Sequence, residues 1–222
     1  MVSKDKQTII LMPPKTASNS VRVLLEQSGW TFCKEPIPSQ PTIHLKLSEL
    51  IESYGIDNPS DYKIIQITRN PYTRFVSSFY FQKKILPNNY NPIFKDYSIS
   101  EFTHHLKESK KSSDFIKAFY GDVSFVINNI KNGINWGGSR LYDTQVSWND
   151  SNQSVIYFKL EELINDITPL KELLNLDSSN LPNINSQEIG IDYTSLLTPD
   201  VIQSIMDMFH DDFKTFGYST LL

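Results

Sequence analysis

Three short apolar runs along this chain have the pattern of buried β-strands. They span residues 8–12, 62–68 and 155–158, and the first is bounded by Pro13 and Pro14. Runs of this length that end at turn-forming residues are typical of strands packed on both faces. Because the strands alternate with helical segments, the pattern predicts an α/β fold with a central parallel sheet flanked by helices. In such sheets, ligands bind at the carboxyl ends of the strands.

Helices are predicted where apolar residues recur at intervals of three and four. The expected ranges are 20–28, 46–54, 71 to about 84, 99–106, 114–119, about 160–174 and 199 to about 216. Gly29 and Gly55 are expected to stop the first two helices. Asn70 and Thr198 each precede a proline, which is the order expected of an N-cap residue followed by the first helical residue.

Length and composition favour a single globular domain over residues 1–222. The chain has 222 residues, enough to bury a substantial core, and 13 Phe, 11 Tyr and 3 Trp to fill it. The net charge of −4 argues against a nucleic-acid partner, so an anionic ligand requires a local basic site. The only cysteine, Cys33, excludes an internal disulfide and a Cys-rich zinc site, and no pattern of metal ligands stands out.

The N-terminal residues lead into a short apolar run only. Neither a signal peptide nor an apolar stretch of about 20 residues is found in the sequence. We therefore expect a soluble, cytoplasmic protein without a membrane partner.

The first strand leads into a turn with the chemistry of an anion site, Pro13-Pro14-Lys15-Thr16-Ala17-Ser18-Asn19-Ser20. At the start of the following helix, unpaired backbone N–H groups and the positive end of the helix dipole favour phosphate or sulfate. Lys15 adds a full positive charge, and the hydroxyls of Thr16, Ser18 and Ser20 add donors. The turn lacks the G-x-x-x-x-G-K-[ST] pattern, so it predicts an anion-binding loop of another class.

A second cluster of donors follows the second strand. Arg69 ends that strand, and Arg74 shares one helix face with Ser77 and Ser78 because they lie three and four residues further on. A guanidinium group offers a planar fork to phosphate oxygens. Alternatively, Arg74 pairs with a surface carboxylate and Ser77 only packs. Two anion sites at the ends of parallel strands would suit a nucleoside that carries phosphates at both ends.

The two motifs resemble those of sulfotransferases that use 3′-phosphoadenosine 5′-phosphosulfate (PAPS). Residues 15–20 are similar to the 5′-phosphosulfate loop, and residues 67–80 to the 3′-phosphate motif. The similarity is closest to the carbohydrate branch, which includes the uronyl 2-O-sulfotransferases. Shorter matches follow in the same order as in the family, at residues 43–45, 100–102, 157–163, 181–185 and 211–218. The resemblance implies a P-loop kinase-like sulfotransferase fold.

The resemblance also implies roles for individual residues. Lys15 would contact the sulfonate and the bridging oxygen, offsetting negative charge on the leaving phosphate. Arg69 and Ser77 would bind the 3′-phosphate of the donor and of its product, adenosine 3′,5′-bisphosphate (PAP), whereas Arg74 would support the loop. The rest of the first loop would hold the 5′-phosphate through backbone amides: Thr16, Ala17, Ser18, Asn19 and Ser20. Asn19 departs from the family, whose members commonly carry Thr there.

His44 is the candidate general base, because an alcohol must lose its proton as it attacks sulfur and an imidazole titrates near neutral pH. The carbohydrate branch carries a His in the same interval between the two motifs. Alternatively, His44 is a loop residue that bonds to the backbone. Glu161 aligns with a family glutamate and is expected to orient a neighbouring loop. Candidates for contact with the acceptor are Gln145, Lys159, Trp136 and Trp148, the tryptophans being equally suited to anchor the core.

Together these features predict transfer of the sulfuryl group of PAPS to a hydroxyl of a carbohydrate or small-molecule acceptor, by in-line displacement and without a metal. The loops at 34–41, 86–97 and 128–152 are expected to shape the acceptor site. Two alternatives stay open. A nucleotide kinase-like phosphotransferase would depend on Mg²⁺, and a non-catalytic module for a sulfated or phosphorylated sugar would bind without consuming donor.

Overall fold

The chain divides into two compact units in a computed structural model. One comprises Met1–Asn70 and Gln145–Ile189, and the other Pro71–Thr144 and Gly190–Leu222. The structure describes residues 1–32, 44–85, 98–109, 141, 143–177, 181–182 and 196–221. The predicted helix at 114–119, the loops at 34–41 and 86–97, Cys33 and Trp136 lie outside the described residues.

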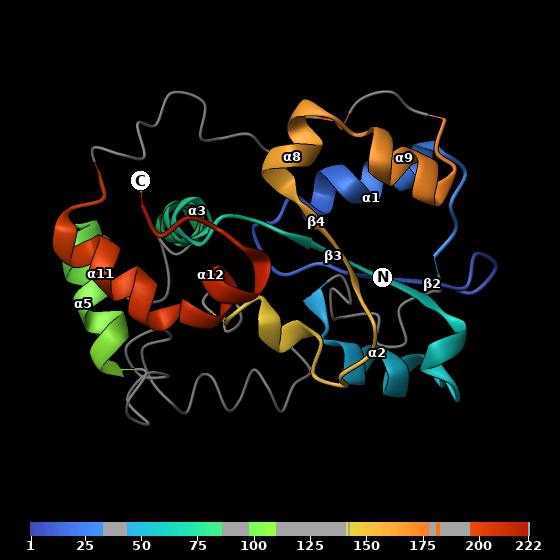
Figure 1. The fold of residues 1–222 in the computed structure, drawn as a ribbon, viewed down its shortest axis with the longest axis horizontal. Helices are drawn as coiled ribbons and strands as arrows, with labels where there is room; N and C mark the ends of the chain where they lie inside the picture. Colours follow the sequence, from blue (N-terminus) through green and yellow to red (C-terminus); the bar gives the residue numbers. More distant parts are fainter. Residues whose placement is uncertain are drawn as a thin grey trace. The chain divides into compact units, whose positions relative to one another are not determined.

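The first unit contains a mostly parallel sheet in the order β1-β2-β3-β4 (Figure 1). Its strands, within the described residues, are β1 Val2–Ser3, β2 Thr8–Leu11, β3 Lys63–Thr68 and β4 Ile156–Lys159. Strands β2, β3 and β4 run parallel, with Ile10 opposite Ile65 and Ile65 opposite Ile156. The three predicted strands and the α/β class are thus confirmed. Strand β1 was not predicted, because two residues are too few for a periodic pattern; it pairs antiparallel to β2.

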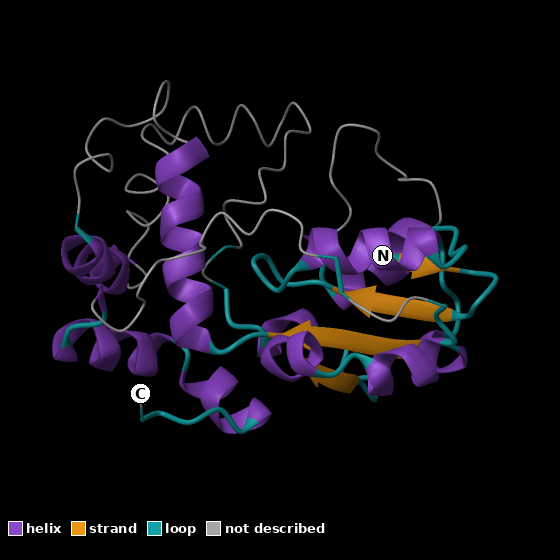
Figure 2. Ribbon diagram, turned by 90° about the horizontal axis from the view of Figure 1, so that it is seen from above, coloured by secondary structure: helices purple, strands orange, loops and turns teal. Residues whose placement is uncertain are grey.

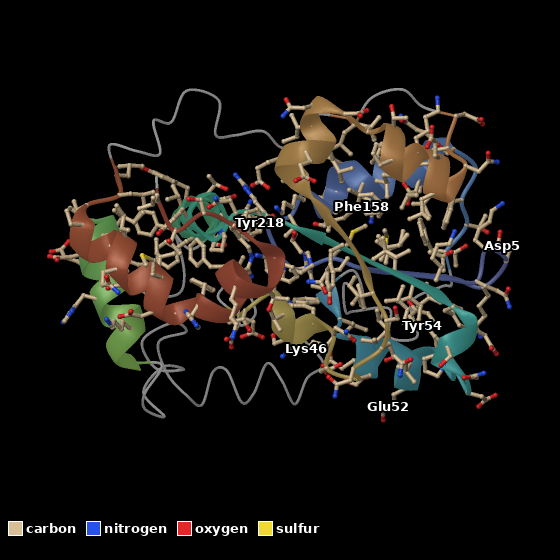
Figure 3. The ribbon with its side chains drawn as sticks, in the orientation of Figure 1. Asp5, Lys46, Glu52, Tyr54, Phe158 and Tyr218 are labelled. Carbon is tan, nitrogen blue, oxygen red and sulfur yellow. The ribbon has the colours of Figure 1, made fainter. Side chains whose placement is uncertain are left out.

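Helices cover both faces of this sheet (Figures 1 and 2). Alternate residues of β2 point to opposite faces, as the period of a strand requires. Ile10 and Met12 pack with α1 Ser18–Gln27, α8 Leu160–Asn165 and α9 Thr168–Leu174, whereas Ile9 and Leu11 pack with α2 Leu47–Tyr54. Figure 3 labels one side chain at the margin of each cluster: Phe158 on β4 joins the first, and Tyr54 on α2 the second.

Two predicted helices are each divided into two, so the prediction of single helices there was wrong. The range 160–174 forms α8 and α9, because Pro169 supplies no N–H and starts a new helix with Thr168. The Asp166 carboxylate, just before this start, accepts from the Thr168 N–H at 2.9 Å. Hydrogen bonds from the backbone and the side chain of Thr168 lower the pKa of Asp166. The range 199–216 forms α11 Pro199–Met208 and α12 His210–Phe216, divided at Phe209, whose backbone leaves helical geometry (φ −119°).

The second unit is helical in its described residues and has an aromatic core. It comprises α3 Pro71–Ile85, α5 Ile99–Ser109, α11 and α12. Pro71 is the first residue of α3, as predicted. Ring centroids lie 4.9 Å apart for Tyr72 and Phe213, and 5.1 Å for Phe79 and Phe102. Burial raises the pKa of Tyr72, whose hydroxyl donates to the carbonyl of Thr220 at 2.9 Å.

Arg74 is buried within this second unit, with 1% of its surface exposed. Its Nη2 donates to the carbonyl of Leu141 at 3.1 Å, and its Nη1 lies 4.0 Å from Oδ2 of Asp212. The guanidinium also lies 5.8 Å from the ring centroid of Phe209. The carboxylate that pairs with Arg74 is therefore a buried one and not a surface one. Arg74 supports the packing of its unit, in agreement with the structural role that the resemblance implies.

We expect Asp212→Asn to lower the free energy of unfolding by about 3 kcal/mol, because the substitution leaves the buried charge of Arg74 without its counter-charge. Urea denaturation followed by circular dichroism measures the change. The matched control is Asp211→Asn, which removes an exposed carboxylate one residue earlier and should leave stability within about 0.5 kcal/mol of the original. Equal losses in the two variants would contradict the assigned role of the buried pair.

Candidate functional site

Two residues of the turn between β2 and α1 have a left-handed backbone. Ala17 is the N-cap of α1 in the left-handed conformation (φ 62°, ψ 31°), and its side chain makes no capping hydrogen bond. Lys15 is also left-handed (φ 67°). A left-handed backbone costs a non-glycine residue about 1–2 kcal/mol, so the surrounding structure holds this turn in place. Turns of this kind aim successive N–H groups into a concavity that attracts anions.

Thr16 fixes the shape of this turn. Its hydroxyl donates to the carbonyl of Pro13 at 2.7 Å, and its side chain is fully buried. The Thr16 hydroxyl, predicted as a donor to the anion, therefore donates within the loop instead. The backbone N–H of Thr16 stays a candidate donor to an anion. Ser18 and Ser20 are buried, whereas Asn19, the residue that departs from the family, is exposed.

Arg69 lies beside this turn. It follows the last residue of β3, and β3 is the parallel neighbour of β2, so both loops leave the same edge of the sheet. Its Nη1 donates to the carbonyl oxygen of Lys15 at 3.2 Å. The structure therefore brings Arg69, the first charged residue of the second motif, to the turn that carries Lys15.

Two side chains hold the backbone that follows β3. Gln145 bonds to both polar groups of the Arg69 main chain: its Oε1 accepts from the N–H and its Nε2 donates to the carbonyl, each at 2.8 Å. Glu161 accepts from the N–H of Asn70 at 2.8 Å, which confirms that it orients a neighbouring loop. Gln145 is fully buried, so its predicted contact with an acceptor was wrong.

His44 lies against the start of the Lys15 turn. Its Nδ1 donates to the carbonyl of Met12 at 2.9 Å. A carbonyl only accepts, so Nδ1 carries the proton and Nε2 is the basic nitrogen of the neutral ring. The ring of Trp148 meets His44 edge-on, with centroids 6.5 Å apart and planes at 82°. Trp148 is fully buried and thus anchors the core of its unit.

The segment that carries Gln145 and Trp148 is tied to a third element of the first unit. It forms a short 3₁₀ helix at Val146–Trp148 and continues to Asp150. There the carboxylate of Asp150 accepts from the N–H and the hydroxyl of Ser48, at 2.8 and 2.6 Å, at the start of α2. The sequence did not predict that this segment packs against β3 and α2. One residue could have indicated it: Gln66 is a polar residue in the middle of a buried strand, and it donates to the carbonyl of Gln145 at 2.8 Å.

Ser77 belongs to the second unit, on α3. Its hydroxyl is buried and has no hydrogen-bond partner in the described part of the chain. The adjacent hydroxyl of Ser78 donates to Leu141 at 3.4 Å, beside Arg74. A buried hydroxyl without a partner is uncommon in proteins.

The described residues contain no group of three or more His, Cys, Asp or Glu side chains arranged to hold a metal ion. None of the helices described is both long and apolar enough to cross a membrane. Lys159 was predicted to contact the acceptor substrate. Its Nζ lies 3.7 Å from Oε1 of Glu162 on the following helix.

The chain was compared with known proteins at the level of families, curated sequences and solved structures. The model of the sulfotransferase family matches residues 1–219. The matched range includes the Lys15 turn, His44 and Arg69, and it extends over both units. No curated protein and no solved structure matches the chain.

Proposed function

The chain belongs to the sulfotransferase family, and from this premise we propose that it transfers the sulfuryl group of PAPS to a hydroxyl of a carbohydrate acceptor. The observation that carries the proposal is the 3.2 Å hydrogen bond from Arg69 Nη1 to the Lys15 carbonyl. It sets the two basic residues at one edge of the sheet, within reach of one ligand that has an anionic group at each end. The histidine between the two motifs, as in the carbohydrate branch, supports the choice of acceptor.

The described residues fit the donor on two counts. The start of α1 has no side-chain cap, and the left-handed turn before it leaves backbone N–H groups for a 5′-phosphate. Arg69 would bind the 3′-phosphate through its guanidinium fork. Binding of that phosphate by Ser77 stays a prediction from the sequence motif. When bound, PAPS supplies an activated sulfuryl group joined to a phosphate that departs.

In this reaction, His44, Lys15 and the N-terminus of α1 each have a defined task. His44 accepts at Nε2 the proton that the acceptor hydroxyl loses as its oxygen bonds to sulfur. The ammonium of Lys15 would stabilise the negative charge that develops on the departing phosphate. The α1 N-terminus would hold the 5′-phosphate of the donor and so orient the reacting sulfuryl group. The scheme needs no metal ion because the chain itself supplies the positive charge.

A thermal shift experiment tests this proposal. With PAP at about a hundred times its dissociation constant, we expect Tm to rise by about 5 °C or more, since a ligand that binds only the folded state stabilises it by about 2.7 kcal/mol. ATP with Mg²⁺ should raise Tm far less, because it lacks the 3′-phosphate. Adenosine 5′-monophosphate is the matched control for the contribution of that phosphate.

Other outcomes of this experiment would favour the alternatives. A larger response to ATP with Mg²⁺ than to PAP would contradict the proposal in favour of a phosphotransferase. A response to PAP without consumption of PAPS across a panel of carbohydrate acceptors would point to a binding module. Following radiolabelled sulfate from PAPS into the acceptors distinguishes the second case.

A further inference from the structure

The backbone of Arg69 lies just beyond the last paired residue of its strand. Strand β3 ends at Thr68, which pairs with Lys159, the last residue of β4. The main-chain N–H and carbonyl of Arg69 therefore lie past the end of the β3–β4 ladder. Main-chain polar groups withdrawn from water require partners, and here the side chain of Gln145 bonds to both of these part-buried groups. The side-chain amide thus satisfies the same two groups that a neighbouring strand would satisfy in an antiparallel ladder.

We propose that Gln145 is a positioning residue: it fixes the main chain of Arg69 and thereby aims the guanidinium at the 3′-phosphate of the donor. This inference rests on the proposed function, which gives Arg69 its ligand. It adds to the site a residue that lies outside both anion-binding motifs.

Gln145 is itself held in place within the first unit. It is fully buried, and its carbonyl accepts from Nε2 of Gln66 at 2.8 Å, from a side chain that is also fully buried. Strand β3 therefore holds the main chain of Gln145, and the side chain of Gln145 in turn holds the residue that follows β3. With Glu161 on the N–H of Asn70, the two residues after β3 are both bound by side chains.

The chemistry of the contact explains why a glutamine is suited to it. An uncharged amide offers an acceptor and a donor on one planar group, matching the N–H and carbonyl of one residue. A glutamate would keep the acceptor and lose the donor, and a methionine would fill a similar volume with neither. Binding of phosphate by a guanidinium fork depends on the direction of the fork, so a shift of the Arg69 main chain should weaken contact with the 3′-phosphate selectively.

Isothermal titration of PAP and of adenosine 5′-monophosphate tests the proposal in Gln145→Met and Gln145→Glu. We expect Gln145→Met to lose about tenfold or more in affinity for PAP, with the affinity for the monophosphate unchanged within about twofold. Gln145→Glu should lose less than Gln145→Met. In the Arg69→Ala background, Gln145→Met should have no further effect on PAP affinity.

The matched control is Gln153→Met. That glutamine is half-buried in the same unit, and its amide donates to the carbonyl of Ser151 at 3.3 Å within its own turn. It should bind both nucleotides as the unaltered chain does. Circular dichroism and Tm confirm folding of each variant, and Gln145→Glu carries the test should Gln145→Met fail to fold.

Three results would overturn the inference while leaving the proposed function standing. The first is an equal loss of affinity for both nucleotides in the Gln145 variants, and the second is a further loss on top of Arg69→Ala. The third is a preference for PAP that is as large in both variants as in the unaltered chain. An unaltered chain that binds PAP no better than the monophosphate overturns the proposed function and this inference with it.

Discussion

Replacing Lys15 with alanine should lower kcat by about a thousandfold and leave the fold intact. In the proposed mechanism the ammonium group faces charge that develops on the leaving phosphate, and removing one such preorganised group costs about a hundred- to a thousandfold in rate. The fold should survive because the substitution removes only a half-buried side chain. The carbonyl of residue 15, which accepts from Arg69, stays in place. Steady-state kinetics with PAPS and an acceptor, with Tm measured in parallel, test both parts.

The distribution of the loss between kcat and KM is informative. A group that acts mainly in the transition state lowers kcat, whereas one that binds substrate and transition state equally raises KM alone. Lys4→Ala is the matched control, since Lys4 is exposed in the turn between β1 and β2. An unchanged kcat for Lys15→Ala would remove Lys15 from the chemical step, and a loss confined to KM would restrict it to donor binding.

Replacing His44 with asparagine should also lower kcat, by about a thousandfold, which lies within the range for loss of a general base. Asparagine is informative because its amide can still donate to the Met12 carbonyl, as Nδ1 of His44 does at 2.9 Å. It has no basic nitrogen to take the place of Nε2. The variant therefore keeps the contact with the loop and loses the proton acceptor.

The pH dependence of turnover gives a second readout for His44. A histidine base must be neutral to accept a proton, so kcat of the unaltered enzyme should fall on the acid side as the imidazole becomes protonated. That acid limb should be absent in His44→Asn. His210→Asn serves as the control, because His210 is exposed at the start of α12. A variant at position 44 with an unaltered pH profile would leave His44 only its role as a loop residue bonded to the backbone.

The sequence could predict the features that depend on a few neighbouring residues. The three strands of the parallel sheet and most helix starts follow from apolar spacing, glycines and prolines, and the observed elements lie within a few residues of the predicted ranges. The prediction of an anion site at the Lys15 turn is equally local, because a strand, a basic residue and a helix start are contiguous there. The sequence also contains the signal for the break between α8 and α9, which is Pro169. The regular apolar spacing across this proline nevertheless led to the prediction of one continuous helix.

The sequence predicted that Arg69 and Arg74 belong to one cluster of donors. Only the tertiary structure shows that the two arginines have different partners. Arg69 contacts the Lys15 turn, whereas Arg74 is buried beside Asp212 and Phe209, which come from the far end of the chain. Gln145 shows the same limit, because nothing near it in the sequence indicates a partner at Arg69. Periodicity and turn chemistry act over a few residues and can be read locally. The partners of a buried polar group are chosen by packing between distant segments, which no local pattern contains.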